Sequence, residues 1–328
     1  MTILLTGGSG FLGSHVAEQL SQAGRRVRVL VRKSSDTKFL SSLPEVELAY
    51  GAVDDRASVL EAARGVTGIV HAAGLVKARS ADEFMRVNRG GTENLLEAAV
   101  ENRSTLKRFV LVSSLAALRP SDVSGGAIPE DAEPRPVTSY GKSKLAAERA
   151  ALSKKDQIPL TIVRPPAIYG PRDREILAFF KSIKLGVLPL LGPSQNRLSM
   201  IYGADCGAAC IAVLDADKPS GTAYHIDDGA VHTMEELIML TESAMAQRAR
   251  LRIPLPRKVV ETAAFGSELF GRLSGKAVML TRDKCNELFE QWVCDGSRAR
   301  RELGWEPKVS FEEGIRLTVD WYRKAGWL

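Results

Sequence analysis

The sequence predicts an α/β protein in which a doubly wound parallel sheet of the Rossmann type is followed by a smaller, mostly helical C-terminal lobe. Short apolar runs alternate with helix-length segments through the first half of the 328 residues, and a glycine-rich turn follows the first run directly. Beyond Pro165 this alternation loosens, and Pro and Gly punctuate the chain. Apolar strands separated by helices are typical of βαβ units, whose parallel sheet is buried on both faces.

Six apolar runs are expected to form the strands of this sheet, since β-branched and other apolar residues dominate each one. They span residues 2–6, 26–31, 46–50, 68–73, 108–114 and 159–165. We therefore expect a dinucleotide-binding Rossmann domain at residues 1–165, to which the chain returns around 200–225. Residues 166–199 and 226–328 are expected to form the substrate-binding lobe.

The segment LLTGGSGFLGSH supplies three glycines, Gly7, Gly10 and Gly13, between the first expected strand and a helix. Glycines at this spacing allow a tight turn and a close approach of the backbone to a pyrophosphate, which then lies at the positive end of the helix. A glycine triplet alone is weak evidence. Here the strand before it and the helix after it both agree with dinucleotide binding.

The end of the second expected strand indicates which dinucleotide is bound. Arg32, Lys33 and Ser34 follow this strand, and no carboxylate occurs there before Asp36. A carboxylate would bind the ribose 2′-hydroxyl of NAD, whereas cations and a hydroxyl suit the 2′-phosphate of NADP. Because Arg and Lys also occur at ordinary solvated strand ends, the sequence favours NADP(H) and leaves NAD(H) open.

The segment TSYGKSKLAAE places Tyr140 one helical turn before Lys144, so both side chains lie on the same face of a helix. Taken alone, such a pair is more often a solvated surface pair than a catalytic one. A tyrosine with a pKa of about 10 is a poor base at neutral pH, and a nearby Lys cation is expected to lower that pKa. Beside a cofactor site the pair is a candidate for acid/base chemistry.

Together these motifs resemble the extended short-chain dehydrogenase/reductase family, also called the NAD-dependent epimerase/dehydratase family. The resemblance covers nearly the whole chain and is closest to the dihydroflavonol-reductase and 3β-hydroxysteroid-dehydrogenase branch. It rests on the order and spacing of a set of segments: TGGSGFLG (6–13), VHAAG (70–74), Asn88 in VNRGGTENLLEAA, Ser113 with Ser114, Tyr140 with Lys144, RPPAIYGP (164–171) and the closing residues 295–323.

The resemblance implies that Tyr140 is the general acid/base, that Lys144 is its electrostatic partner and a ribose ligand, and that Ser114 donates a hydrogen bond to the substrate oxygen. Ser113 is the rival for that last role, because adjacent strand residues point to opposite faces. Nicotinamide would carry the hydride. The implied cofactor-binding residues are Gly7, Gly10, Phe11, Leu12, Gly13, Arg32, Lys33, Ser34, Val53, Ala72, Ala73, Gly74, Tyr140, Lys144, Pro165 and Ile168.

Three positions depart from the family pattern. Ala52, rather than an Asp, follows Gly51 after the third expected strand, so adenine recognition is expected to use backbone groups such as those of Val53. Asp205, in YGAD, stands where the family has an HVDD-like run, and we expect it to be structural, as a helix cap. The segment SSLAALRP lacks both the Tyr-Gly of many sugar-nucleotide epimerases and the acid pair of the dehydratases, which points away from dehydration.

These features predict an NADP(H)-dependent oxidoreductase that interconverts a ketone or aldehyde and an alcohol, with Tyr140 as general acid/base. A nucleotide-sugar epimerase with a retained NAD is the alternative, supported by RPPAIYGPRD and by Arg197, which stands near where the family often has a pyrophosphate-binding Arg. A nucleotide sensor without turnover would not need Tyr140 and Lys144. The apolar residues 259–273 are expected either to line an apolar substrate site or to form a core-packed helix.

Composition limits the expected partners. The net charge of +6 arises from charges that alternate along the chain, so we expect no nucleic acid and a small carbonyl or alcohol substrate. The four cysteines show no CxxC spacing, and His15, His225 and His232 lack metal-ligand spacing, which predicts no metal site and a cytoplasmic location. The apolar run that opens the chain is too short to span a membrane. The family resemblance suggests a homodimer.

Overall fold

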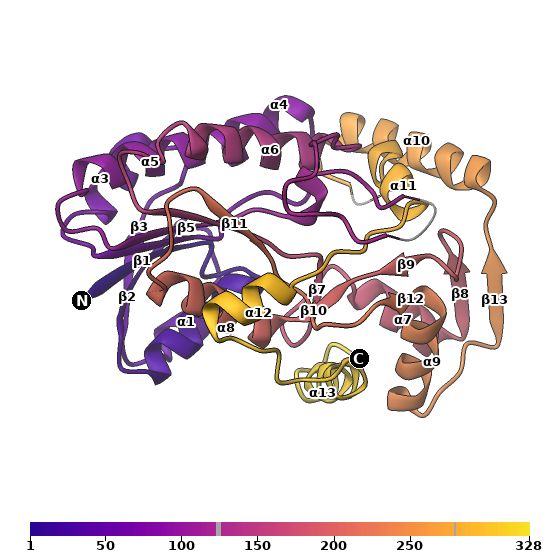
Figure 1. The fold of residues 1–328 in the computed structure, drawn as a ribbon. Helices are drawn as coiled ribbons and strands as arrows, with labels where there is room; N and C mark the ends of the chain where they lie inside the picture. Colours follow the sequence, from indigo (N-terminus) through magenta and orange to yellow (C-terminus); the bar gives the residue numbers. More distant parts are fainter. Residues whose placement is uncertain (123–125, 279) are drawn as a thin grey trace.

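Seven parallel strands form the central sheet, in the order β11-β6-β5-β4-β1-β2-β3 (Figure 1). The computed structural model describes residues 1–122, 126–278 and 280–328. The strands of this sheet are β1 (Thr2–Thr6), β2 (Arg26–Val31), β3 (Val46–Tyr50), β4 (Gly68–His71), β5 (Arg108–Val112), β6 (Leu160–Arg164) and β11 (Thr222–His225). All six expected strands are present, and the Rossmann-type doubly wound fold is confirmed.

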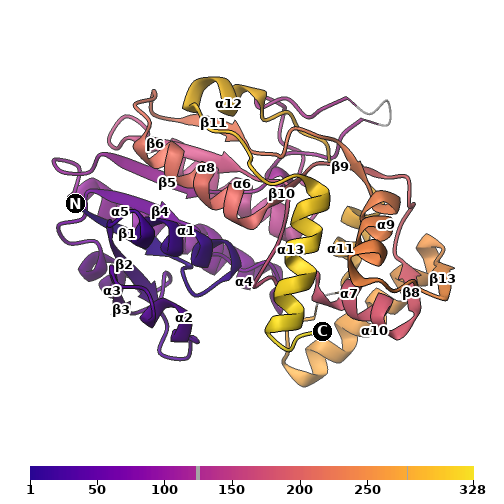
Figure 2. The ribbon, with the colours of Figure 1, turned by 90° about the horizontal axis from the view of Figure 1, so that it is seen from below.

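Helices cover both faces of the sheet, as the burial of a parallel sheet requires. The layer on one face consists of α1 (Phe11–Gln22) and α8 (Gly203–Asp215), which pack against each other (Figure 2). The layer on the other face consists of α3 (Arg56–Ala62), α5 (Gly91–Glu101) and α6 (Ser139–Leu152) (Figure 1). Each layer has its own apolar core, with Val16 of α1 in one and Leu95 of α5 in the other.

Side-chain caps fix where several helices begin. Asp55 accepts a hydrogen bond from the N–H of Ala57 at the start of α3. Thr138 accepts one from the N–H of Gly141, at 2.9 Å, at the start of α6. Each cap satisfies a backbone donor that the first helical turn leaves without a partner. The start of α6 is therefore set by a residue two positions before Tyr140.

The second half of the chain is mostly helical, and most of it lies at one end of the sheet (Figure 2). Its helices are α7 (Leu177–Leu185), α9 (Met234–Met245), α10 (Arg257–Ser274), α11 (Arg282–Leu288), α12 (Ser297–Leu303) and α13 (Phe311–Lys324). Short strand pairs join these helices: β7 (Ala167–Tyr169) with β10 (Met200–Tyr202), β9 (Arg197–Leu198) with β12 (His232–Thr233), and β8 (Val187–Leu190) with β13 (Leu251–Pro254). An aromatic cluster that includes Tyr169, Phe180 and Tyr322 forms its core. The smaller helical lobe is thus confirmed.

Two polar side chains tie segments of the second half to their neighbours. Arg172, whose φ of 74° is unusual for a residue with a side chain, donates to the carboxylate of Glu18 in α1 at 2.7 Å. Asp205 accepts a hydrogen bond from the N–H of Val309 at 3.0 Å. The expected helix cap at Asp205 is wrong, because the N-cap of α8 is Tyr202 and the Asp205 carboxylate instead holds the segment before α13.

Candidate active site

The turn between β1 and α1 has the shape needed to hold a pyrophosphate. Gly7 has a φ of +77°, and a Cβ there would lie 2.7 Å from the carbonyl carbon of Ala72. A Cβ on Gly13 would lie 2.1 Å from the carbonyl oxygen of Gly7, so only glycine lets α1 approach the turn this closely. Helix α1 begins after Gly10, which has no side chain to cap it, so the first N–H groups and the positive helix end are open to an anion. These residues fit a dinucleotide.

The residues that follow the turn and those that follow β4 lie side by side. Phe11 and Leu12 are the first residues of α1 and are half-buried, and Leu12 packs against the apolar core beneath the helix. The N–H of Ala72 donates to the carbonyl oxygen of Thr6 at 3.2 Å, and the N–H of Ala73 donates to the Thr6 hydroxyl at 3.3 Å. The structure therefore brings together two of the segments that were expected to hold the cofactor.

The end of β2 presents the three residues expected to choose the dinucleotide. Arg32, Lys33 and Ser34 are exposed, and among the described residues no ion pair or side-chain hydrogen bond occupies Arg32 or Lys33. The carboxylate of Asp36 accepts a hydrogen bond from the backbone N–H of Lys38 at 3.1 Å. The exposed cations can therefore meet an added phosphate, while the nearest carboxylate is engaged in its own turn.

The loop after β3, where adenine recognition is expected, is held by side chains from two helices. The Ser58 hydroxyl accepts from the N–H of Ala52 at 3.1 Å, and Asn94 donates to the carbonyl oxygen of Val53 at 2.9 Å. Asp54 is paired with Arg86, and Asp55 caps α3, so both acids beyond Ala52 are engaged. Val53 is half-buried in this loop.

Lys144 is buried in α6 and points at the carboxyl end of β5. It is 7% exposed, and its Nζ donates a hydrogen bond to the carbonyl oxygen of Val112 at 2.7 Å. Burial lowers the pKa of Lys144 to about 8, and the Glu148 carboxylate acts in the opposite direction. A Cβ on Gly74 would lie 3.7 Å from the Lys144 Nζ, so the loop after β4 passes directly over the ammonium group.

Tyr140 lies one turn before Lys144 on α6, with its ring centroid 6.1 Å from that of Phe84. Burial raises the pKa of Tyr140 to about 12, and the Glu287 charge adds to this rise. The Ser114 hydroxyl lowers the pKa of Tyr140 by hydrogen bonding, so the two side chains lie within reach of each other. The lowering expected from Lys144 is not found in this structure, where loss of hydration outweighs the hydrogen bond from Ser114.

The two adjacent serines have different surroundings. The Ser113 Oγ is buried and has no hydrogen-bond partner among the described residues. The Ser114 Oγ accepts a hydrogen bond from the N–H of Ala116 at 3.2 Å, at the start of the short helix η2 (Leu115–Ala117), and acts on the phenol of Tyr140. The geometry therefore brings Ser114, rather than Ser113, to Tyr140.

Asn88 was noted in a motif, but its part in the site was not expected. It lies in the π-helical segment η1 (Met85–Gly90), and its Oδ1 accepts from the N–H of Leu75 at 2.7 Å. Its Nδ2 donates to the hydroxyl of Ser143 at 2.8 Å. One buried amide thus joins the loop after β4 to α6, next to Lys144. A π-helical turn is rare and frequently marks a functional site, although nothing local in the sequence signals it.

The remaining expected residues lie beyond the end of β6. The carbonyl oxygen of Pro165 accepts from the N–H of Leu115 at 2.9 Å, which joins it to the segment after Ser114. Ile168 lies in β7 and packs against the core under α1 and α8. Arg197 lies in β9, and its carbonyl oxygen accepts from the N–H of Trp292 at 2.9 Å.

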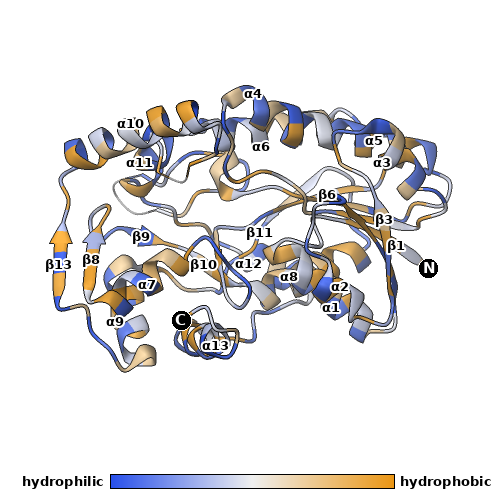
Figure 3. Ribbon diagram, turned by 180° about the vertical axis from the view of Figure 1, so that it is seen from behind, coloured by the Kyte–Doolittle hydropathy of each residue, from blue (hydrophilic) through white to orange (hydrophobic). Residues whose placement is uncertain are grey.

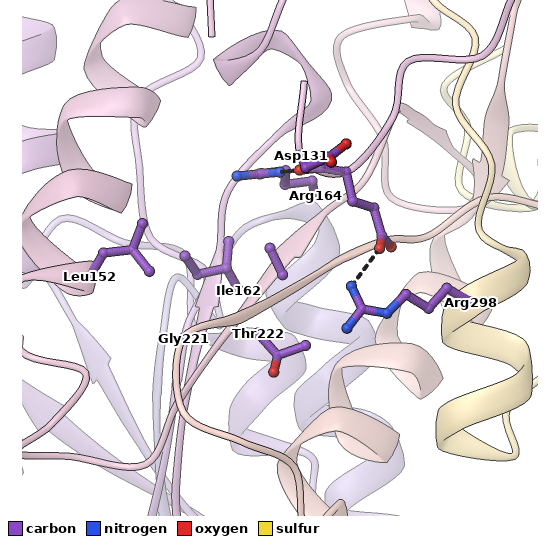
Figure 4. A pocket seen from close by; sticks show the side chains of 9 residues that line it. Asp131, Leu152, Ile162, Arg164, Gly221, Thr222 and Arg298 are labelled. Atoms are coloured by element: carbon purple, nitrogen blue, oxygen red, sulfur yellow. Dashed lines mark hydrogen bonds and ion pairs between the residues drawn. The ribbon is translucent and has the colours of Figure 1, made fainter. Parts of the chain in front are cut away.

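Two cavities lie near these elements. One, of about 450 Å³, is lined by Gly74, Leu75, Val76, Lys77, Arg79, Glu83, Gly275 and Ala277. Gly74 of this lining neighbours Lys144, because a Cβ built on it would lie 3.7 Å from the Lys144 Nζ. The other, of about 550 Å³, opens at the outer edge of the sheet between β6 and β11, where Arg298 of α12 donates to the Glu130 carboxylate at 2.8 Å (Figure 4). None of the expected site residues lines this second cavity.

The apolar residues 259–273 form most of α10, but neither expected role describes them fully. Val260, Ala264 and Gly271 are buried, whereas five large apolar side chains of the helix are exposed. Across the described part of the chain, no three His, Cys, Asp or Glu side chains gather as metal ligands would. In the same residues, no helix combines the length and apolar character needed to cross a bilayer.

This chain is similar to known proteins in sequence and in fold. The chain is similar to a ceramide reductase of Caulobacter vibrioides, with 35% identity over 99% of this chain and 96% of the relative. It is 30% identical to a 3β-hydroxysteroid dehydrogenase/Δ5→4-isomerase of Mycobacterium tuberculosis, over 98% of this chain and 90% of the relative. The crystal structure of a dTDP-glucose 4,6-dehydratase from Streptomyces venezuelae with NAD bound matches with a TM-score of 0.82 and 26% identity, covering 100% of this chain and 98% of that one.

Residues 3–227, more than half of the chain, match the NAD dependent epimerase/dehydratase family. This match includes the glycine turn, Tyr140 and Lys144. The chain therefore belongs to the NAD-dependent epimerase/dehydratase family of oxidoreductases, the extended short-chain dehydrogenases/reductases.

Proposed function

We propose that the protein is an NADP(H)-dependent oxidoreductase that interconverts a ketone or aldehyde and an alcohol, with Tyr140 as general acid/base. The observation that carries this proposal is the grouping of Ser114, Tyr140 and Lys144 at the carboxyl end of β5, beneath the loop that begins at Gly74. When bound, the nicotinamide supplies a hydride. The chain supplies the proton and the geometry.

Tyr140 is suited to give a proton to a carbonyl oxygen as that oxygen becomes a hydroxyl. With a pKa of about 12, the buried phenol is protonated at neutral pH. The Ser114 hydroxyl beside it would donate to the same oxygen and stabilise the negative charge that develops there. Lys144 would favour the phenolate after the proton has left, and its remaining N–H donors suit the ribose hydroxyls.

The residues that would hold the dinucleotide come from three loops at one edge of the sheet. Gly7, Gly10 and Gly13 would receive the pyrophosphate, and the loop at 72–74 would lie along the nicotinamide half. The NADP(H) preference is supported by the exposed Arg32, which has no ion-pair partner among the described residues and is followed by Lys33.

For the substrate we infer an apolar carbonyl compound of the lipid or sterol class. Two relatives over nearly the whole chain are named as a ceramide reductase and a 3β-hydroxysteroid dehydrogenase. The cavity beside Lys144 supports the same class, because Leu75, Val76 and Ala277 contribute aliphatic lining.

A nucleotide-sugar epimerase that retains NAD is the second candidate. It is supported by the segment RPPAIYGPRD and by Arg197, and the sugar-nucleotide dehydratase of Streptomyces venezuelae shares the fold. An epimerase would oxidise and re-reduce one carbon, so it would keep its cofactor through each turnover.

Purification followed by absorbance spectroscopy and an NADPH oxidation assay separates the two candidates. The panel contains long-chain ketones, steroid ketones, short aldehydes, and UDP- and dTDP-sugars. We expect NADPH to be oxidised by an apolar ketone and a purified protein without tightly held nucleotide. Retained NAD together with interconversion of a nucleotide sugar, and no NADPH oxidation by any ketone, would overturn the proposal in favour of the epimerase.

We also propose that residues 1–165 with 200–225 form the cofactor domain, and that 166–199 and 226–328 form the substrate lobe, within a homodimer. The pairing of β11 with β6 supports the return of the chain to the first domain. The cavity between Gly74 and Gly275 supports a substrate site that both parts contribute to. Light scattering of the purified protein measures the number of copies.

A further inference from the structure

Helix α10 presents a large apolar surface to solvent. Figure 3 shows the helix at the outer end of the molecule, with hydrophobic residues along its length. The exposed large apolar side chains of this helix, which we call the α10 face, are Val259, Phe265, Leu269, Phe270 and Leu273. At about 100° per residue, they fall within an arc of about 140° around the helix. Phe270 and Leu273 are 64% and 82% exposed, whereas the Arg282 guanidinium lies 5.5 Å from the ring centroid of Phe265, at one edge of the arc.

Positive charges stand at both ends of the α10 face. Lys258 precedes it, and Arg272 and Lys276 follow it; all three are exposed, and none forms an ion pair among the described residues. The two acids of the helix, Glu261 and Glu268, are each paired with an arginine. By the helical spacing, both acids lie outside the apolar arc, Glu268 toward buried Ala264 and Glu261 about 40° from Phe265 at the edge of the arc. The exposed side of α10 is therefore apolar in the middle and cationic at its ends.

The α10 face ends beside the candidate active site. Gly275, at which α10 ends, and Ala277 line the cavity of about 450 Å³ whose opposite wall is formed by residues 74–77. Val76 in that wall is 58% exposed. Gly74 in the same wall neighbours Lys144, because a Cβ built on it would lie 3.7 Å from the Lys144 Nζ. The C-terminal end of the α10 face therefore adjoins the cavity that Gly275 and Gly74 line.

We propose that the α10 face binds the surface of an anionic lipid bilayer, with the helix lying in the headgroup region parallel to the membrane plane. The 18-residue helix is not apolar enough to cross a bilayer, and its exposed arc has the two properties of an interfacial helix. The aromatic and aliphatic side chains suit the boundary of the acyl chains. The cations at both ends suit acidic headgroups, which attract each exposed Lys or Arg.

Membrane binding by the α10 face does not depend on the proposed function. That a lipid carbonyl compound passes from the bilayer into the cavity at Gly275 rests on the proposed function. Binding of the bilayer rests only on the α10 face and its charges.

The test is flotation of the whole protein with vesicles of equal phosphatidylglycerol and phosphatidylcholine, beside vesicles of phosphatidylcholine alone. We expect the wild type to float with the anionic vesicles, and its binding to weaken as salt rises from about 0.1 M to about 1 M. Phe270→Glu should reduce vesicle binding by about tenfold or more, because it places a charge in the apolar arc. Lys276→Glu should reduce it about fivefold or more, and on the anionic vesicles only.

Met239→Glu is the matched control, because Met239 is also exposed, at 53%, but lies on α9. It should leave vesicle binding unchanged. The proposal is overturned if the wild type does not bind anionic vesicles, or if Met239→Glu weakens binding as much as Phe270→Glu. It is also overturned if Phe270→Glu only turns a dimer into a monomer in light scattering, because the α10 face would then be a contact between two copies.

The ketone panel keeps this proposal separate from the proposed function. Vesicle binding without oxidation of NADPH by any ketone would support the α10 face and overturn the proposed function. Reduction of a soluble ketone without vesicle binding would support the proposed function and overturn membrane binding by the α10 face.

Discussion

The ammonium Nζ of Lys144 donates a 2.7 Å hydrogen bond to the carbonyl oxygen of Val112, the last residue of β5. A lysine in this place is anchored to the sheet, but it has lost most of its hydration. The hydrogen bond fixes the ammonium group beneath Gly74, and the lost hydration lowers the pKa of Lys144 to about 8. The burial that holds the Lys144 Nζ in place therefore also lowers its pKa.

Replacing Lys144 should change how stability depends on pH. Because its pKa is about 8 in the folded protein and 10.5 otherwise, the unfolded chain binds more protons between these values. The buried charge therefore costs about 3 kcal/mol below pH 8, and this cost fades as the pH rises toward 10.5. Relative to wild type, Lys144→Met should gain about 2 kcal/mol more unfolding free energy at pH 7 than at pH 10, measured by urea unfolding.

Lys142→Met is the control for this measurement, since Lys142 is exposed on the same helix. It should show no such difference between the two pH values. An equal effect of pH on both variants would contradict a buried charge at Lys144.

Tyr140→Phe should keep the ring in place but remove the transferable proton. Turnover should fall by about 10²- to 10⁴-fold, while unfolding free energy and cofactor affinity stay close to wild type. The measurement is single-turnover oxidation of bound NADPH by a ketone from the panel. Tyr50→Phe, at a 59% exposed tyrosine, serves as the control. Near wild-type rates in Tyr140→Phe would end the acid/base assignment.

Ser114→Ala should lower turnover by about two to three orders of magnitude, because it removes a donor to the developing oxyanion. Cofactor affinity should change little. Ser113→Ala should have a much smaller effect, since the Ser113 hydroxyl has no hydrogen-bond partner among the described residues. Steady-state kinetics on both variants make the comparison, and the reverse ranking would assign the role to Ser113.

Arg32→Asp should weaken NADP(H) binding by about 1.5–3 kcal/mol, as expected for a lost charge-assisted contact, and should relatively favour NAD(H). Fluorescence titration with both cofactors measures the two affinities. Arg26→Asp changes an exposed arginine at the other end of β2 and should leave the ratio of the two affinities unchanged. If the wild type bound NAD(H) more tightly than NADP(H), the proposed NADP(H) preference would be wrong.

Acid should destabilise the protein through three buried histidines. Burial lowers the pKa of His15, His71 and His225 to about 3, with nearby cations adding to the shift. The unfolded chain therefore binds more protons between pH 6.5 and 3, so stability falls across this range, by about 2 kcal/mol per histidine at pH 5. In His71→Gln, the free energy of unfolding measured with urea should fall less between pH 7 and pH 5 than in the wild type.

His232 should behave in the opposite way. Burial lowers its pKa, but hydrogen bonds and charges of Asp228 and Glu236 more than offset this and raise the pKa above its usual value. Its contribution is fully present below pH 6.5 and is lost as the pH rises through the raised pKa. In His232→Gln, the free energy of unfolding should therefore fall more between pH 7 and pH 5 than in the wild type, opposite to His71→Gln. A smaller fall than in the wild type would contradict the charged state of His232.

Most of the sheet could be predicted because the local sequence of six of its strands is a short apolar run. Each of the six expected runs is rich in apolar residues, and each forms a strand. The four residues of β11, TAYH, lie outside the six expected runs. They are short and mixed in character, and they become a strand by pairing with β6 rather than through their own pattern.

The candidate site was predictable only where spacing alone defines it. Tyr140 and Lys144 lie four residues apart on one helix, and the glycines lie three apart in one turn, so local geometry brings each set together. The choice between Ser113 and Ser114, the raised pKa of Tyr140 and the bridge through Asn88 depend on burial and on contacts between distant segments. Such contacts leave no periodic trace in a single sequence.

The pairing of β11 with β6 affects how the chain folds during its synthesis. Residues 165–221 separate the two strands, and α8, which packs on α1, lies in the same interval. During synthesis the outer edge of β6 therefore stays unpaired until residues 222–225 have left the ribosome, and an unpaired edge invites aggregation. The sheet begins at the first residues of the chain, yet its assembly has to wait for two thirds of the protein.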